Sequence, residues 1–205
     1  AFAKKSFRMP TFNDLYYADM GNSKLNPESA LQYDLGFVLN KDWKQGIVDH
    51  FRLQVDGYYN TVHDKIVAYP KGQQFRWTML NLGKVHINGL DAKVSATLRP
   101  LRKLYVTTRL QYTYQQAIDV TNPADTYYRD QIPYIPWNSG AAVVQMDYGT
   151  WCLNYSFIYT GERYNQQENI IYNHTQPWST HDLSLQKSFN WKDYKARVAL
   201  EVNNL

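Results

Sequence analysis

Several features are missing from this sequence of 205 residues, and each absence excludes a class of structure. Cys152 is the single cysteine, so no disulfide can form within the chain and no cysteine-based metal site is available. No run of about 18 apolar residues occurs, which excludes a transmembrane helix. Lys and Arg are scattered, and the formal net charge is only +4, so nucleic-acid binding is not expected.

Tyrosine is abundant instead, with 18 copies beside 6 tryptophans. Such rings suit an interface between oil and water, because one end of the ring is apolar and the other forms hydrogen bonds. A plainer explanation is that tyrosine is a good strand former. The positions of the rings along the chain therefore matter more than their number.

Alternation of apolar and polar residues predicts eight β-strands. In the clearest segment, 104–114, Val106 and Leu110 point to one side while Arg109 and Gln111 point to the other. A period of two residues indicates a strand with one dry face and one wet face. The expected strands are 30–39, 49–60, 84–98, 104–115, 139–148, 151–160, 179–189 and 194–203.

The connections between these strands alternate in length. Short turns are expected at 40–48, 99–103, 149–150 and 190–193, and long segments at 61–83, 116–138 and 161–178. In an up-and-down sheet this places every short turn on one side and every long loop on the other. Bacterial outer-membrane barrels have this asymmetry, whereas a soluble sandwich has no reason to sort its loops by side.

The dry faces carry almost no charge, apart from Lys187 near the end of its strand. A charge on the lipid side of a barrel costs about 2–4 kcal/mol at the bilayer midplane, so this distribution fits a wall in lipid. Aromatic residues also form bands at both strand ends, such as Trp151 and Trp191 near turns and Trp137 near a long loop. In the strand 84–98 the alternation changes phase at Gly89, which predicts a bulge or kink there.

The first thirty residues carry a more specific signal. Residues 7–17 read FRMPTFNDLYY, and residues 21–28 read GNSKLNPE. Further on, NLGKVHINGLD spans 81–91 and VNNL spans 202–205. Taken together, these motifs resemble the C-terminal barrel part of TonB-dependent outer-membrane receptors, over essentially the whole chain. The sequences of these motifs are most similar to those of cobalamin receptors of the BtuB type, particularly the receptors of Bacteroidota. Ferric siderophore receptors are the second most similar group.

The resemblance implies an all-β fold, an antiparallel up-and-down transmembrane β-barrel segment that supplies about eight strands of a 22-stranded barrel. Residues 1–29 would form an extracellular loop region after a preceding strand, and 30–203 the eight strands. The family's plug domain has no counterpart here, and the VNNL motif stops where family members continue, so we expect a piece of a larger receptor.

Function also follows from the resemblance as an expectation. It implies a location in the bacterial outer membrane and TonB-dependent uptake of a large metal-bearing ligand, cobalamin or a ferric siderophore, rather than an enzyme activity. The implied partners are the remaining barrel and plug, the TonB complex, a surface lipoprotein and the lipid bilayer. No covalently bound cofactor is expected. Calcium stays open as a bound ion, although no residue pattern supports it.

Candidate ligand-binding residues lie in the three long segments. They are aromatic, amide and cationic side chains: Tyr69, Phe75 and Trp77; Tyr127, Tyr128 and Arg129; Tyr164, Asn165 and Tyr172. Such side chains suit a bulky, partly apolar ligand, although loop tyrosines can also be simple turn and interface filler. Catalysis is not expected, because the neighbours in His63-Asp64 and His181-Asp182 point to opposite faces of a strand.

Two other hypotheses stay open from the residues alone. One is a stand-alone eight-stranded outer-membrane barrel with a structural or small-pore role. The other is a soluble β-sandwich binding module, whose outer face would also be polar and whose inner face would also be apolar.

Overall fold

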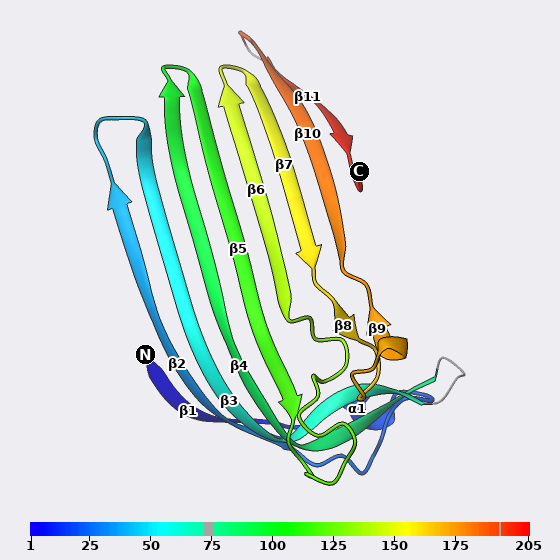
Figure 1. Ribbon diagram of the computed structural model, residues 1–205. Helices are drawn as coiled ribbons and strands as arrows, with labels where there is room; N and C mark the ends of the chain where they lie inside the picture. Colours follow the sequence, from blue (N-terminus) through cyan, green and yellow to red (C-terminus); the bar gives the residue numbers. More distant parts are fainter. Residues whose placement is uncertain (72–75, 193) are drawn as a thin grey trace.

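One curved antiparallel sheet makes up most of the structure, a computed structural model that describes residues 1–71, 76–192 and 194–205. Its strands lie side by side in chain order (Figure 1). They are β1 (Phe2–Arg8), β2 (Glu28–Asp42), β3 (Val48–Lys71), β4 (Arg76–Leu101), β5 (Leu104–Asp119), β6 (Asn138–Tyr148), β7 (Trp151–Thr160), β10 (Trp178–Trp191) and β11 (Tyr194–Val202). Shorter elements are α1 (Phe12–Tyr16), η1 (Ile171–Asn173), and the small pair β8 (Arg163–Tyr164) and β9 (His174–Thr175).

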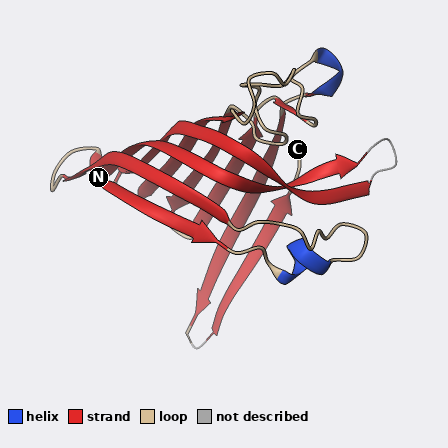
Figure 2. Ribbon diagram, turned by 90° about the horizontal axis from the view of Figure 1, so that it is seen from below, coloured by secondary structure: helices blue, strands red, loops and turns tan. Residues whose placement is uncertain are grey.

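The sheet is a single layer that curves like part of a cylinder wall (Figures 1 and 2). Within the described residues β1 and β11 do not pair with each other, so the wall stays open. This confirms the all-β, antiparallel fold class. It also excludes a β-sandwich, which needs two packed sheets, and a small closed barrel, which needs its edge strands paired. Neither α1 nor η1 is long and apolar enough to cross a membrane.

Short turns and longer connections lie at opposite ends of the strands (Figure 1). We call the end of the sheet with the turns at residues 43–47, 102–103, 149–150 and 192 the turn end, and the opposite end the loop end. Gly149 has φ +60° in the tightest turn, a left-handed conformation that glycine adopts without steric cost. The predicted sorting of connections by side is therefore confirmed.

Cross-strand register builds the two faces of the wall. One row across six strands is apolar throughout: Leu39, Leu53, Val94, Leu110, Ala142 and Phe157. The neighbouring row, which points to the other face, is mostly polar: Asn40, Arg52, Ser95, Arg109, Val143, Ser156 and Asp182. Large apolar side chains such as Leu35 and Leu200 are exposed on the first face. A contiguous exposed apolar surface of this extent indicates contact with another apolar phase.

The loop end differs from the sequence prediction in two places. Residues 1–29 do not form only a loop region, because β1 pairs with β2 over Phe2–Arg8. The described part of the segment 61–83 is not a loop either, because β3 continues through it to Lys71 and pairs there with β4, which begins at Arg76. Val62 and Ile66 in this extension are almost fully buried, which explains why the strands persist where a loop was expected.

The bulge predicted at Gly89 is absent. The register of β3 with β4 runs without a shift from His50 to Lys71, straight through the pair Tyr58 and Gly89. The apolar residues change phase for another reason: at the loop end the inner face of the sheet is covered, so apolar side chains there turn inward. Val85 on this inner face is completely buried.

A small core lies at the loop end, beneath the connections. It contains Ala30, Val62, Leu82, Val85, Ala117 and Ile132, with Val67, Leu80, Ile87 and Ile135 packed against it. Gln131 is buried among these residues with 1% of its surface exposed. Its side-chain oxygen accepts from the Ala117 N–H, and its amide nitrogen donates to the carbonyls of Gln115 and Ile135. The core thus fixes the β5–β6 connection on the end of the sheet.

Candidate ligand-binding surface at the loop end

The motif at residues 7–17 builds a fixed corner between β1 and β2. Thr11 caps α1, accepting from the Asp14 N–H while the Asp14 carboxylate accepts from the Thr11 N–H at 2.9 Å. Arg8 also pairs with Asp14 at 3.0 Å. The hydrogen bond from the Thr11 backbone is the main cause that lowers the pKa of Asp14, and the Arg8 charge adds to it. Asp14 is therefore a structural carboxylate.

Glu28, the last residue of the second motif, ties three strands together. Its carboxylate accepts from the buried Ile66 N–H at 3.1 Å and from Lys65 at 3.3 Å, both on β3. Arg8 of β1 lies 3.7 Å from the same carboxylate. Nearby, Asn22 donates to the Met79 carbonyl on β4. These motif residues hold the β1–β2 connection against the β3–β4 hairpin, so their role is to support the surface rather than to contact a ligand.

The β5–β6 and β7–β10 connections are joined by a network of side-chain bonds. Asn169 accepts from the Gln131 N–H at 2.7 Å and donates to the Gln131 carbonyl at 3.0 Å. The Asn169 N–H donates to the carboxylate of Asp130, and Thr126 donates to Glu168 at 2.8 Å. Two segments distant in sequence therefore form one surface. None of these partners could be paired from the sequence, because loop-to-loop contacts leave no periodic signal.

Aromatic residues from three connections meet on this surface. The rings of Trp77 on β4 and Tyr134 in the β5–β6 connection lie 5.2 Å apart. The Tyr134 N–H donates to the Tyr164 carbonyl, and the Tyr164 ring lies 5.7 Å from that of His174. Trp77 and Tyr164, both predicted, are thus brought together through Tyr134. Sequence reasoning missed Tyr134, whose one signal is an aromatic ring in the stretch PYIPW at 133–137.

The remaining predicted residues lie around this group. Tyr69 is on the β3 arm of the hairpin, and Phe75 lies outside the described residues. Tyr128 and Arg129 are exposed in the β5–β6 connection, and Tyr172 in η1 is 89% exposed. Burial, followed by the negative charge of Asp125, raises the pKa of Tyr127. Tyr127 therefore stays neutral around pH 7 and offers a hydroxyl that can donate or accept a hydrogen bond.

Asn165 is the most specific polar feature of the surface. Its backbone N–H donates to the Asn173 carbonyl at 2.9 Å, which fixes the residue between β8 and η1. Its side-chain oxygen is buried and, among the described residues, has no hydrogen-bond partner. A buried acceptor without a partner costs about 1–3 kcal/mol, so such an atom calls for an explanation. A donor group on a bound ligand would satisfy it.

Two further aromatic residues were missed by the sequence analysis. Phe12 and Tyr16 lie on α1 with their rings 5.2 Å apart, and 76% and 61% of their surfaces are exposed. The signal that could have found them is the FRMPTFNDLYY motif itself, in which two aromatic residues stand one helical turn apart, a spacing that places both rings on one contact surface.

The inner face of the wall is polar and carries charges of both signs. Asp56 and Asp91 are direct cross-strand partners, and Thr113 donates to Asp91 at 2.6 Å. Toward the turn end, Arg52 and Arg109 line a hollow of about 360 Å³. Two carboxylates opposite each other repel, and the hydrogen bonds from Thr113 to Asp91 and from Gln54 to Asp56 offset part of this cost.

His181 and Asp182, neighbours in β10, contact different partners on opposite faces of the sheet. Asp182 accepts from Ser156, while His181 lies 2.7 Å from the Tyr155 hydroxyl on the other face of the sheet. The predicted separation of His181 and Asp182 is therefore confirmed. Among the described side chains, no group of three or more His, Cys, Asp or Glu residues could hold a metal ion. The surface can bind a ligand by stacking and hydrogen bonds.

A comparison with protein families identifies the family to which this chain belongs. The family model described as "TonB dependent receptor-like, beta-barrel" matches residues 1–205. The chain belongs to the TonB-dependent receptor family. It is therefore part of an outer-membrane β-barrel of a family of transporters rather than enzymes, and the apolar face of its sheet faces lipid.

Relatives by sequence include two proteins named vitamin B12 transporter BtuB. The one from Photobacterium profundum is 26% identical over 175 residues, 82% of this chain and 25% of the relative. The one from Vibrio vulnificus is 29% identical over 85 residues, 42% of this chain and 13% of the relative. The chain thus spans a quarter or less of the length of these relatives.

Solved structures share the fold of this receptor segment. The copper transporter OprC matches with a TM-score of 0.65 at 15% identity, covering 98% of this chain and 30% of OprC. BauA, the ferric preacinetobactin receptor from Acinetobacter baumannii, matches with a TM-score of 0.59 at 16% identity, covering 87% of this chain and 25% of BauA. At these identities the likeness concerns the fold of the wall alone.

Proposed function

We propose that this chain is the loop-bearing wall of an outer-membrane receptor that takes up a large metal-bearing ligand, with cobalamin as the favoured ligand. Uptake would depend on a plug domain, which would belong to the rest of the receptor, and on the separate TonB complex. A surface lipoprotein would be a further partner. In this orientation the turn end faces the periplasm and the loop end faces the outside of the cell.

The observation that carries the proposal is the surface formed by Trp77, Tyr134, Tyr164 and Asn165. It is held by hydrogen bonds between two connections, so it is largely formed before a ligand arrives. Its side chains are neutral, and Arg129 is the single charged residue among the predicted candidates. Cobalamin is a bulky ring system with many neutral amide groups, which can donate to the buried Asn165 oxygen and lie against the aromatic rings.

The two sequence relatives described above support the same ligand, since each is named a vitamin B12 transporter. A ferric siderophore is the alternative, because the receptor BauA has the same fold. Ferric siderophore complexes that carry negative charge would need cations on the surface. The neutral side chains of Trp77, Tyr134, Tyr164 and Asn165 therefore favour cobalamin over such complexes.

Binding of cyanocobalamin to the full-length receptor tests the proposal. Calorimetry would compare the wild type with Tyr172→Ala, which removes an exposed ring of the loop surface, and with Tyr148→Ala at the turn end as a matched control. Interface tyrosines cost more than about 1 kcal/mol when truncated at hot spots, so we expect Tyr172→Ala to weaken binding by about fivefold or more. Tyr148→Ala should bind as the wild type does.

Competition with a ferric catecholate siderophore separates the two ligands. We expect this complex not to displace cyanocobalamin. If the receptor binds the ferric complex and not cyanocobalamin, the cobalamin assignment is wrong. If Tyr148→Ala weakens binding as much as Tyr172→Ala, the loop end is not the binding surface.

A further inference from the structure

Lys187 is a cation on the face of the sheet that meets lipid. Its cross-strand partners are Trp151 on β7 and Val198 on β11, which belong to the apolar rows of their strands. A charge on this face is unfavourable unless a partner compensates it. Among the described residues Lys187 makes no salt bridge, so none of their carboxylates compensates its charge.

Aromatic rings hold the Lys187 ammonium at this position. The amine lies 4.0 Å from the centre of the Trp151 ring and 5.8 Å from that of Phe189. Phe189 in turn stacks on Trp191, with ring centres 6.3 Å apart. The contact with Trp151 keeps the charge over the lipid-facing surface, where cation–π attraction offsets part of the cost of leaving water.

An apolar hollow continues from Lys187 toward the middle of the sheet. It measures about 330 Å³ and is lined by Leu185, Val198 and Leu200 together with Trp151, Lys187 and Phe189. Lys187 is the single charged residue of this lining. The site therefore has a cation at the turn end and an apolar trough running into the bilayer, which is the arrangement of charge and apolar surface in a phospholipid.

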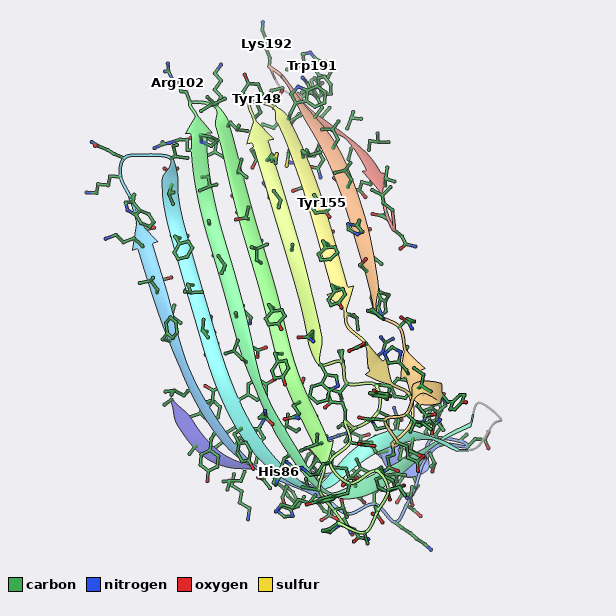
Figure 3. The ribbon with its side chains drawn as sticks, in the orientation of Figure 1. His86, Arg102, Tyr148, Tyr155, Trp191 and Lys192 are labelled. Atoms are coloured by element: carbon green, nitrogen blue, oxygen red, sulfur yellow. The ribbon has the colours of Figure 1, made fainter. Side chains whose placement is uncertain are left out.

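The turn end as a whole favours anionic headgroups. Lys41 lies 5.9 Å from the Trp43 ring centre on the same face, a second pairing of lysine with tryptophan. Arg102 and Lys192 extend from the turns, at the same end as Trp191 (Figure 3). Basic residues near a membrane surface attract anionic lipids. This end faces the periplasm, so the leaflet in contact with Lys187 is the inner leaflet of the outer membrane.

We propose that Lys187, Trp151 and the trough of Leu185, Val198 and Leu200 bind one anionic phospholipid of the inner leaflet. The phosphate of the headgroup pairs with the Lys187 ammonium, and an acyl chain lies in the trough. The site rests on the outer-membrane placement of the wall and not on the identity of the transported ligand. It faces lipid, away from the loop end, and so differs from the proposed cobalamin surface.

Native mass spectrometry of the full-length receptor tests this site. The delipidated receptor is titrated with phosphatidylglycerol or with phosphatidylcholine, and bound lipids are counted. One lysine near a membrane surface contributes enough to anionic lipid binding to change affinity about fivefold. We expect Lys187→Gln to weaken phosphatidylglycerol binding by about that factor and Lys187→Arg to preserve it.

Two variants separate the site from general lipid contact. Lys195→Gln removes the same charge at the same end of the sheet, but Lys195 pairs with Asn190 on the inner face, so lipid binding should not change. Val198→Phe fills the trough, leaves Lys187 in place, and should weaken phosphatidylglycerol binding. If Lys187→Gln binds phosphatidylglycerol like the wild type, or if the wild type does not prefer it over phosphatidylcholine, the contact is ordinary boundary lipid and the proposal is wrong.

Discussion

Replacing Glu28 by alanine should loosen the whole corner formed by β1, α1 and β3. The Glu28 carboxylate is buried, and it is the acceptor for the Ile66 N–H and the partner of Lys65 and Arg8. Alanine removes all three contacts without adding bulk. The Ile66 N–H, which belongs to a residue with 4% of its surface exposed, then has no side-chain acceptor.

The magnitude follows from these contacts. A buried N–H left without an acceptor costs about 1–3 kcal/mol. The two ion pairs involve partly exposed side chains, 25% for Lys65 and 46% for Arg8, so together they contribute no more than about 1 kcal/mol after screening by solvent. With the middle of the first range, about 2 kcal/mol, and up to about 1 kcal/mol from the ion pairs, the free energy of opening this corner should fall by about 2–3 kcal/mol, which increases the open population roughly 30- to 150-fold.

Hydrogen–deuterium exchange of the full-length receptor measures this opening. Amide exchange around Ile66 and in the β1–β2 connection should accelerate by the factor above in Glu28→Ala. Glu28→Gln is the matched control, because its amide oxygen still accepts from the Ile66 N–H while the charge is lost, so exchange should rise by fivefold or less. Equal rates for the two variants, or no acceleration in Glu28→Ala, would refute the reasoning.

Three further predictions concern single positions. Gly89→Ala should lower the free energy of unfolding by about 1–3 kcal/mol in urea titrations, because a Cβ there would clash with the backbone carbonyl oxygen of Tyr114. Gly57→Ala should be tolerated, because the nearest atom to its Cβ would be 3.8 Å away. Asn165→Leu should leave thermal stability unchanged or higher but weaken ligand binding in calorimetry, because it removes a buried acceptor without a protein partner among the described residues. The pKa of Asp14 is lowered, so its carboxylate stabilises α1 fully above the ordinary aspartate pKa of about 3.9. This stabilisation is lost as the pH falls through the lowered pKa. Limited proteolysis of the β1–β2 connection should therefore accelerate only in strong acid.

The half of the sheet nearer the turn end could be predicted from sequence because its apolar and polar residues alternate regularly. There the apolar residues of each strand meet one uniform phase, lipid, and strands such as 151–160 begin and end at the residues expected. At the loop end the environment changes within a strand. Val85 and Val62 point their apolar side chains to the inner face, where the connections cover them. The apolar residues therefore change from one face to the other along the strand. From sequence alone this change is interpreted as a bulge at Gly89 and as the end of the strands before a loop over 61–83.

The candidate site was predictable in composition but not in arrangement. Aromatic and amide residues in long connections indicated a binding surface, and Trp77, Tyr164 and Asn165 lie on it. Their contacts depend on Tyr134 and on the bonds between Asn169 and Gln131, two residues that are 38 positions apart. Pairings of this kind depend on tertiary structure, and no local propensity or spacing reports them.

Site-directed spin labelling along β5 of the full-length receptor tests the central claim, that this sheet is a wall of an outer-membrane receptor barrel with its apolar face in lipid. Labels at Thr108, Leu110 and Tyr112 should be accessible to oxygen dissolved in the bilayer, and labels at Arg109 and Gln111 should not, giving a period of two. The native cysteine, on the inner face of β7, would first be replaced by serine. Equal oxygen accessibility at odd and even positions, or the opposite phase, would contradict the claim.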